Sequence, residues 1–140
     1  MGWWKRKQPQ EDVQADAETL WARQRVAATV RRHLAVAGLP VLPDGMYPGG
    51  GPGAVVWVDP GKEAAGTGVW IGWGVAPVLN AYRGQDLAGT EEGAAAETFA
   101  RAVVEAMSGA MRDVLAAVGF GVTVTLAADL SFTVCVETAA

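Results

Sequence analysis

Two short segments near the C-terminal end alternate apolar and polar side chains, and this alternation most constrains the fold. Residues 121–126 and 131–137 place Val, Leu or Phe at every second position, with Thr, Cys or Glu between them. Successive side chains of a strand point to opposite faces of a sheet, so each segment predicts a strand with one apolar face. The short connection between them predicts a hairpin. A one-sided hairpin needs another layer to cover its apolar side.

The segment before this hairpin, residues 90–118, has the period of a helix. Thr90 is of the type preferred at an N-cap, Glu91 and Glu92 fall in the first turn, and Gly119 follows the last turn. Apolar side chains recur at steps of three and four residues, and we expect their stripe to face the sheet. The stripe consists of Phe99, Val103, Met107, Ala110, Val114 and Val118.

A second helix is predicted over residues 11–37. Acidic residues come first and arginines follow, which is the polarity that the helix dipole favours. Gly38 and Pro40 end the segment. The stripe that we expect to face the sheet consists of Val13, Ala17, Leu20, Ala27, Val30 and Leu34.

Two more strands are predicted between the helices, at residues 55–58 and 69–74, joined by a loop rich in turn formers. Pro77 makes residues 75–82 an edge strand, a bulge or a loop. The prolines and glycines of residues 40–54 predict an irregular connector. The element order α-β-β-(β)-α-β-β therefore predicts an α+β fold. We expect a two-layer sandwich, with an antiparallel sheet of four to five strands and two long helices on one face.

The first strand pair differs from the C-terminal hairpin because it is apolar on both faces. Trp70 and Trp73 are three residues apart, so they point to opposite faces of the sheet. Alternation also splits residues 55–58 into two apolar pairs, one on each face. We expect this surface to be a protein interface with Trp70 as its buried anchor. The candidate interface residues are Trp57, Trp70, Val56 and Val58.

Three explanations of the second apolar face stay open. The chain itself can cover the face, because large exposed apolar patches are rare in monomers. The face can be an interface, in a homodimer or with another protein. It can also wall a small-molecule pocket that has a few polar groups. The covering residues considered are residues 40–54, with Met46 and Tyr47, and the N-terminal Trp3 and Trp4; the polar pocket groups are Asp59, Asn80 and Arg83.

Size, composition and charge limit the class of protein. We expect residues 11–140 of this 140-residue chain to form one domain of ordinary size, after a flexible basic and aromatic tail at 1–10. The apolar content of 51% excludes a disordered chain, yet no stretch approaches the roughly 20 apolar residues of a membrane span. The net charge of −4 argues against nucleic-acid binding. Membrane binding is expected to be no more than weak, because the tail residues Trp3, Trp4, Lys5, Arg6 and Lys7 carry too few basic charges.

Residues that carry chemistry are few. Cys135 is the only cysteine, which excludes an intrachain disulfide and a cysteine zinc cluster and favours a cytoplasmic location. It falls on the outer face of the hairpin, where we expect it to be partly exposed. His33 is the only histidine, and neither Ser108 nor Ser131 lies in a Gly-x-Ser-x-Gly motif. The Gly-rich connector 40–54 lacks the Lys-Ser/Thr of a P-loop. We therefore expect no catalytic, cofactor-binding or metal-binding residues, and no enzymatic activity.

The predicted element order resembles two known folds. It looks like the type III secretion chaperone-like fold, whose members are typically homodimeric, non-enzymatic binders of other proteins. It is also similar to the phage tail-terminator-like fold, in which an extended segment runs into an Ala-rich helix, as at residues 82–111. These resemblances imply a protein-interaction module, adaptor- or chaperone-like, or a component of phage or virion assembly. The alternative is a small-molecule-binding domain with a Trp-lined pocket. The excess of Arg over Lys, with abundant Ala and Gly, indicates a high-GC bacterium.

Overall fold

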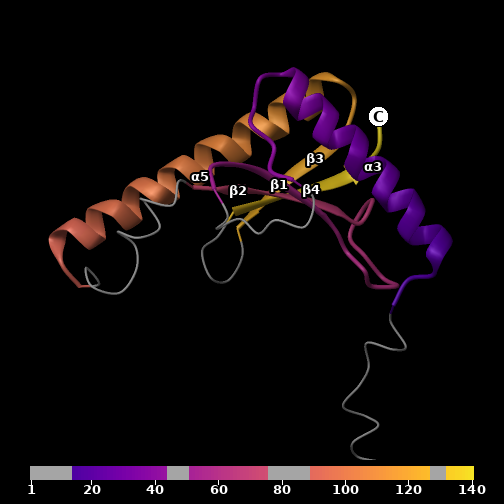
Figure 1. The fold of residues 1–140 in the computed structure, drawn as a ribbon, viewed down its shortest axis with the longest axis horizontal. Helices are drawn as coiled ribbons and strands as arrows, with labels where there is room; N and C mark the ends of the chain where they lie inside the picture. Colours follow the sequence, from indigo (N-terminus) through magenta and orange to yellow (C-terminus); the bar gives the residue numbers. More distant parts are fainter. Residues whose placement is uncertain (1–13, 44–50, 76–88, 127–131) are drawn as a thin grey trace, which may run out of the picture.

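The computed structural model describes residues 14–43, 51–75, 89–126 and 132–140. Its elements are α3 (Ala17–Val36), β1 (Gly53–Val58), β2 (Val69–Gly74), α5 (Glu91–Ala117), β3 (Gly121–Leu126) and β4 (Phe132–Thr138). The strands form an antiparallel sheet in the order β1-β2-β4-β3, and both helices lie on one side of it (Figure 1). The two-layer α+β fold and its element order are thereby confirmed, with four strands among the described residues. The ambiguous segment after Val75 lies outside the described residues.

Helix α3 begins six residues later than the sequence predicts. Asp16 is its N-cap and accepts a hydrogen bond from the Thr19 N–H at 2.8 Å. Residues 14 and 15 are not helical because they pair with the loop after β1, where the Ala15 N–H donates to Pro60 O at 2.9 Å. Residues 11–13 lie outside the described residues.

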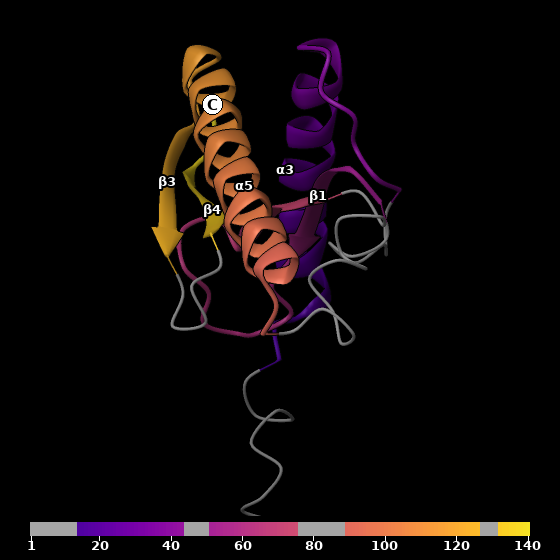
Figure 2. The ribbon, with the colours of Figure 1, turned by 90° about the vertical axis from the view of Figure 1, so that its left-hand side faces the viewer.

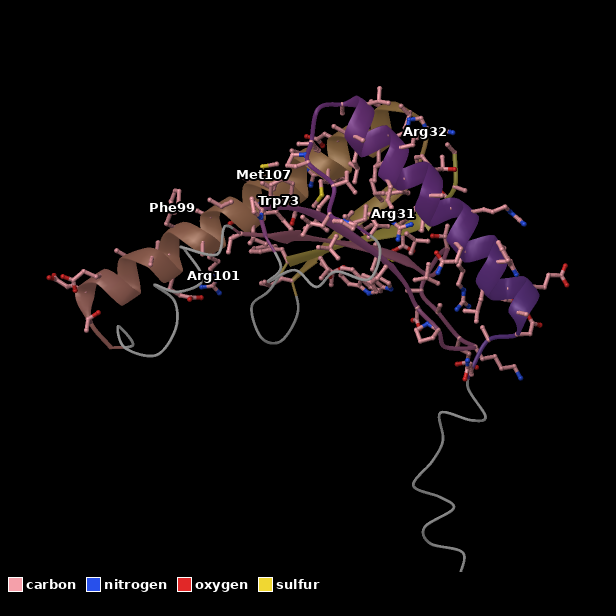
Figure 3. All side chains as sticks on the ribbon, in the orientation of Figure 1. Arg31, Arg32, Trp73, Phe99, Arg101 and Met107 are labelled. Atoms are coloured by element: carbon pink, nitrogen blue, oxygen red, sulfur yellow. The ribbon has the colours of Figure 1, made fainter. Side chains whose placement is uncertain are left out.

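Helix α5 has the predicted bounds but buries a different face. Its N-cap Thr90 accepts a hydrogen bond from the Gly93 N–H at 3.1 Å, and the helix ends before Gly119 as expected. Of the predicted stripe, Phe99 is 61% exposed and Val118 is 42% exposed. Phe99 points away from the sheet, on the part of α5 that extends past the strands (Figures 1 and 3). The fully buried side chains of α5 are Ala100, Ser108, Met111 and Leu115.

The strand register places one set of side chains between the sheet and the helices. Val56 lies opposite Ile71, Ile71 opposite Val134, and Val69 opposite Val136. These residues pack with apolar side chains of both helices and of Phe120. The core cluster consists of Ala27, Val30, Leu34, Ala54, Val56, Val69, Ile71, Met111, Leu115, Phe120, Val134 and Val136. Three of the six residues predicted for the first helical stripe therefore belong to the core: Ala27, Val30 and Leu34.

A buried arginine fixes the loop between β1 and β2. Arg23 lies on the core-facing side of α3 and is 8% exposed. Its Nη1 donates to Asp59 O and to Gly61 O, both at 2.6 Å. Gly68 adopts a φ of +76°, and a Cβ there would lie 2.7 Å from the Arg23 Cδ. The loop is therefore held by hydrogen bonds from a helix rather than by a tight turn.

Candidate functional site

Trp57 and Trp70 are direct neighbours on the side of the sheet away from the helices. The two residues are register partners between β1 and β2. Their chain neighbours Val56 and Ile71 face the helices, so the tryptophans face the opposite way. Trp70 is also the register partner of Cys135, which in turn lies opposite Thr123. One row of side chains thus crosses all four strands on the outer face.

The other two candidate interface residues do not lie with the tryptophans. Val56 is 4% exposed and belongs to the core cluster, and Val58 packs against that cluster. Trp73 also packs against the core from the helix side, as the alternation predicts. The structure therefore divides the four candidates into an outer pair, Trp57 and Trp70, and an inner pair that helps to hold the two layers together.

The outer face is not equally open along its length. Trp57 and Trp70 are half-buried, whereas Val55 and Cys135 on the same face are 4% and 1% exposed. The expectation that Cys135 is partly exposed was therefore wrong. The alternation of apolar and polar residues in β4 determines on which face of the sheet the Cys135 thiol lies. It does not show which residues pack over that face. Among the described residues, the apolar surface of the outer face that a partner could reach is therefore the tryptophan pair.

Cys135 is not suited to nucleophilic chemistry. Its Sγ lies 3.9 Å from Ala65 O, in the loop before β2. Burial raises the pKa of the thiol to about 11, and the negative charge of Glu137 adds to the shift. Because the thiolate is the reactive form, Cys135 is inert at neutral pH.

Polar groups border the row on the side of β3. The Thr123 hydroxyl donates to Glu137 Oε1 at 3.0 Å, and both residues are exposed. Thr67, in the loop before β2, donates from its hydroxyl to Val136 O at 2.6 Å. An apolar tryptophan pair beside a polar border has the composition of a small protein-binding patch.

The polar residues considered for a small-molecule pocket do not gather around the tryptophans. The Asp59 carboxylate accepts a hydrogen bond from the Gly61 N–H at 2.8 Å, and its backbone carbonyl accepts one from Arg23. Asp59 therefore stabilises the β1–β2 loop. Asn80 and Arg83 lie outside the described residues, as do Met46, Tyr47, Trp3 and Trp4.

The described residues place no titratable cluster in a cleft. His33 packs edge-on against Phe120, with ring centroids 5.9 Å apart, and Ser108 is fully buried in α5. Within residues 14–43, 51–75, 89–126 and 132–140, no three His, Cys, Asp or Glu side chains come together as metal ligands. Neither described helix has the length and apolar content needed to cross a membrane.

Sequence reasoning missed several exposed apolar side chains, among them Trp21, Val36 and Phe99 on the helices and Leu126 on β3. Trp21 of α3 is 68% exposed, Phe99 of α5 is 61% exposed, and Leu126 of β3 is 51% exposed. Trp21 could have been found, because it lies off the apolar stripe of its helix. Leu126 follows the alternation of β3 and faces the helix layer, so its exposure shows that this layer does not fully cover the last residue of the edge strand.

Comparison with known proteins gives no further guide to function: no family model, curated protein or solved structure matches the chain.

Proposed function

We propose that this protein is a non-enzymatic protein-interaction module, adaptor- or chaperone-like, that binds another protein through the outer face of its sheet. One observation supports the proposal above the others. Trp57 and Trp70 lie side by side in register on the face that neither described helix covers, and both keep part of their surface exposed. Tryptophan is among the residues most enriched at the energetic centres of protein interfaces.

The backbone around the pair favours binding with little loss of entropy. The tryptophans lie on adjacent strands, and the Asp59 N–H donates to Gly68 O at 2.8 Å just beyond them. Rigid strands hold the two Cα atoms in place before a partner arrives. Preorganised side chains lose less conformational freedom on binding, so more of the contact energy appears as affinity.

The first test asks whether Trp70 is free to meet a partner. We expect Trp70→Glu to leave the melting temperature nearly unchanged, because a charge on a partly exposed face stays hydrated. The matched control is Trp73→Glu, the same change on the core side of β2, which should destabilise by about 2–4 kcal/mol. Equal destabilisation by the two changes would mean that the chain covers Trp70 itself, and the proposal would fail.

The second test asks whether a protein contacts the face. A photoreactive phenylalanine analogue at position 70, expressed in the native host, should form one discrete protein adduct on irradiation. Trp57→Glu should abolish the adduct by disrupting the same patch. The same probe at the exposed position 21 reports non-specific labelling. Identical adducts from positions 70 and 21, or none from position 70, would contradict the proposal.

A further inference from the structure

We infer that β3 pairs with the β3 of a second copy of this chain, so that two sheets join into one across a two-fold axis. The edge formed by β3 shares no residue with the tryptophan pair of β1 and β2.

The two edges of the sheet differ. At the β1 edge, the Ala54 N–H donates to Pro40 O and its carbonyl accepts from the Leu42 N–H, both at 2.8 Å. Arg31 reaches from α3 and donates from Nη2 to Val56 O at 2.9 Å, whereas Arg32 points away from the sheet (Figure 3). Backbone groups of Ala54 and Val56 that point away from β2 are thus hydrogen-bonded, by residues of the connector and by a side chain of α3. This is usual for a protected edge.

The backbone of β3 points alternately toward β4 and away from the sheet. The Thr67 N–H donates to Val136 O at 2.9 Å, so Val136 turns its backbone groups toward β2. Its neighbour Cys135 therefore turns toward β3, where Thr123 is its register partner. By the same alternation, the N–H and C=O groups of three β3 residues point outward: Val122, Val124 and Leu126. No described strand lies on that side (Figure 2).

The sequence of β3 lacks the side chains that usually block pairing, and its register shift, between Gly121 and Val122, lies at the start of the strand. Gly121–Leu126 reads GVTVTL and contains no charge and no proline, the residues by which edge strands usually avoid each other. Val and Thr are among the residues that favour strands. The apolar side of the strand is also incompletely covered, with Leu126 51% exposed.

A second copy matches this edge better than an unrelated strand does. In antiparallel pairing centred on Val124, that residue meets its own equivalent, Val122 meets Leu126 and Thr123 meets Thr125. Apolar side chains then meet apolar ones on the helix side, and threonines meet threonines on the outer side. No like charges are opposed, because β3 has none. The pairing also covers Leu126 and continues the core of each copy into the other.

A strand pair alone buries less than the roughly 1,200–2,000 Å² of a stable interface. Helix α5 lies over the half of the sheet that ends in β3, so the two-fold axis brings the second α5 beside the first (Figure 2). The C-terminal half of α5 carries Arg112 and Asp113 as an exposed ion pair, with Nε and Oδ1 3.1 Å apart. Exposed charges of both signs thus lie on this half of each helix.

The first experiment measures mass by light scattering across a concentration series. We expect a dimer, and we expect Leu126→Lys to raise its dissociation constant at least about 100-fold, because the symmetric interface contains each buried charge twice. The melting temperature measured on the monomer should not fall, because Leu126 is half exposed. The control is Phe99→Lys, the same change at similar exposure on α5, which should leave the dimer intact.

The second experiment reads the pairing directly by amide exchange. In the dimer, exchange at Val122, Val124 and Leu126 should slow as protein concentration rises. Exchange at Thr123 and Thr125 should be slow at every concentration, because their amides bond to β4 within one chain.

Three results would overturn the inference: a monomer at every concentration, a dimer that survives Leu126→Lys, or a dimer in which the three outward amides exchange fast. Trp70→Glu separates this inference from the proposed function. Loss of the dimer in that variant alone would assign the interface to the tryptophan face and not to β3.

Discussion

Arg23 shows how a single polar residue can order a long loop. Its guanidinium bonds two carbonyls of the β1–β2 loop, and Gly68 packs against its side chain. An alanine at position 68 would have to keep the left-handed φ of Gly68, and its Cβ would displace the Arg23 side chain. We expect Gly68→Ala to reduce the free energy of unfolding by about 2–4 kcal/mol, measured by urea denaturation.

The matched control for this prediction is Gly38→Ala. Gly38 has a φ of +92° but no atom within 4 Å of the position of a Cβ. Its substitution therefore reports only the backbone cost, about 1–2 kcal/mol. If both substitutions reduced the free energy of unfolding equally, the contact between position 68 and Arg23 would contribute nothing to the loss.

Cys135 makes stability depend on pH in the alkaline range. Its pKa is about 11 in the folded protein, against 9.0 for the free thiol. Below pH 9 the thiol is neutral in both the folded and the unfolded state, so its ionisation does not change the free energy of unfolding. Between pH 9 and 11 only the unfolded chain loses the proton, and stability falls by up to about 3 kcal/mol. Urea denaturation from pH 7 to 11 should show this loss in the wild type and not in Cys135→Val. Parallel curves for the two proteins would contradict it.

At the scale of the element, Asp16 decides where α3 begins. Hydrogen bonds from the Thr19 N–H and side chain lower the pKa of the Asp16 carboxyl below its ordinary value of 3.8. A lowered pKa means that the cap stabilises the helix above pH 3.8 and that this contribution is lost as pH falls through the folded-state pKa. NMR titration of the Asp16 carboxyl should give a midpoint below 3.8 in the wild type. Thr19→Pro, which removes the N–H and the hydroxyl together, should return it toward 3.8; an unchanged midpoint would reject the cap as the cause.

At the scale of the whole molecule, three surfaces of the described structure are distinct. The helix side of the sheet is closed by α3 and α5 and holds the core. The outer face carries the tryptophan pair, and the β3 edge, beside which no described strand lies, is on a different side of the molecule. Because the last two surfaces do not share residues, one chain could dimerise through its edge and still present Trp57 and Trp70 to another protein.

Much of the fold could be predicted because local signals and packing agree. Thr90 caps α5 as expected, and the alternation of β3 and β4 places Val122, Val134 and Val136 on the helix side. The start of α3 could not be predicted, because residues 14 and 15 have helix-compatible neighbours but pair with a loop far along the chain. The buried face of α5 was misjudged because periodicity weighs large apolar residues such as Phe99, whereas the helix buries the small Ala100 and Ser108 beside Met111 and Leu115.

The candidate site was also predictable only in part. The sequence by itself determined that Trp70 and Trp73 lie on opposite faces, because side-chain direction in a strand follows from the backbone alone. Only the tertiary structure decided that Trp57 is the register partner of Trp70, that Val56 is in the core, and that Cys135 is buried. Register, burial and strand order depend on contacts between segments distant in the sequence, and no local pattern encodes them. For the same reason, only the sheet order shows that β3 is an edge while its partner β4 is not.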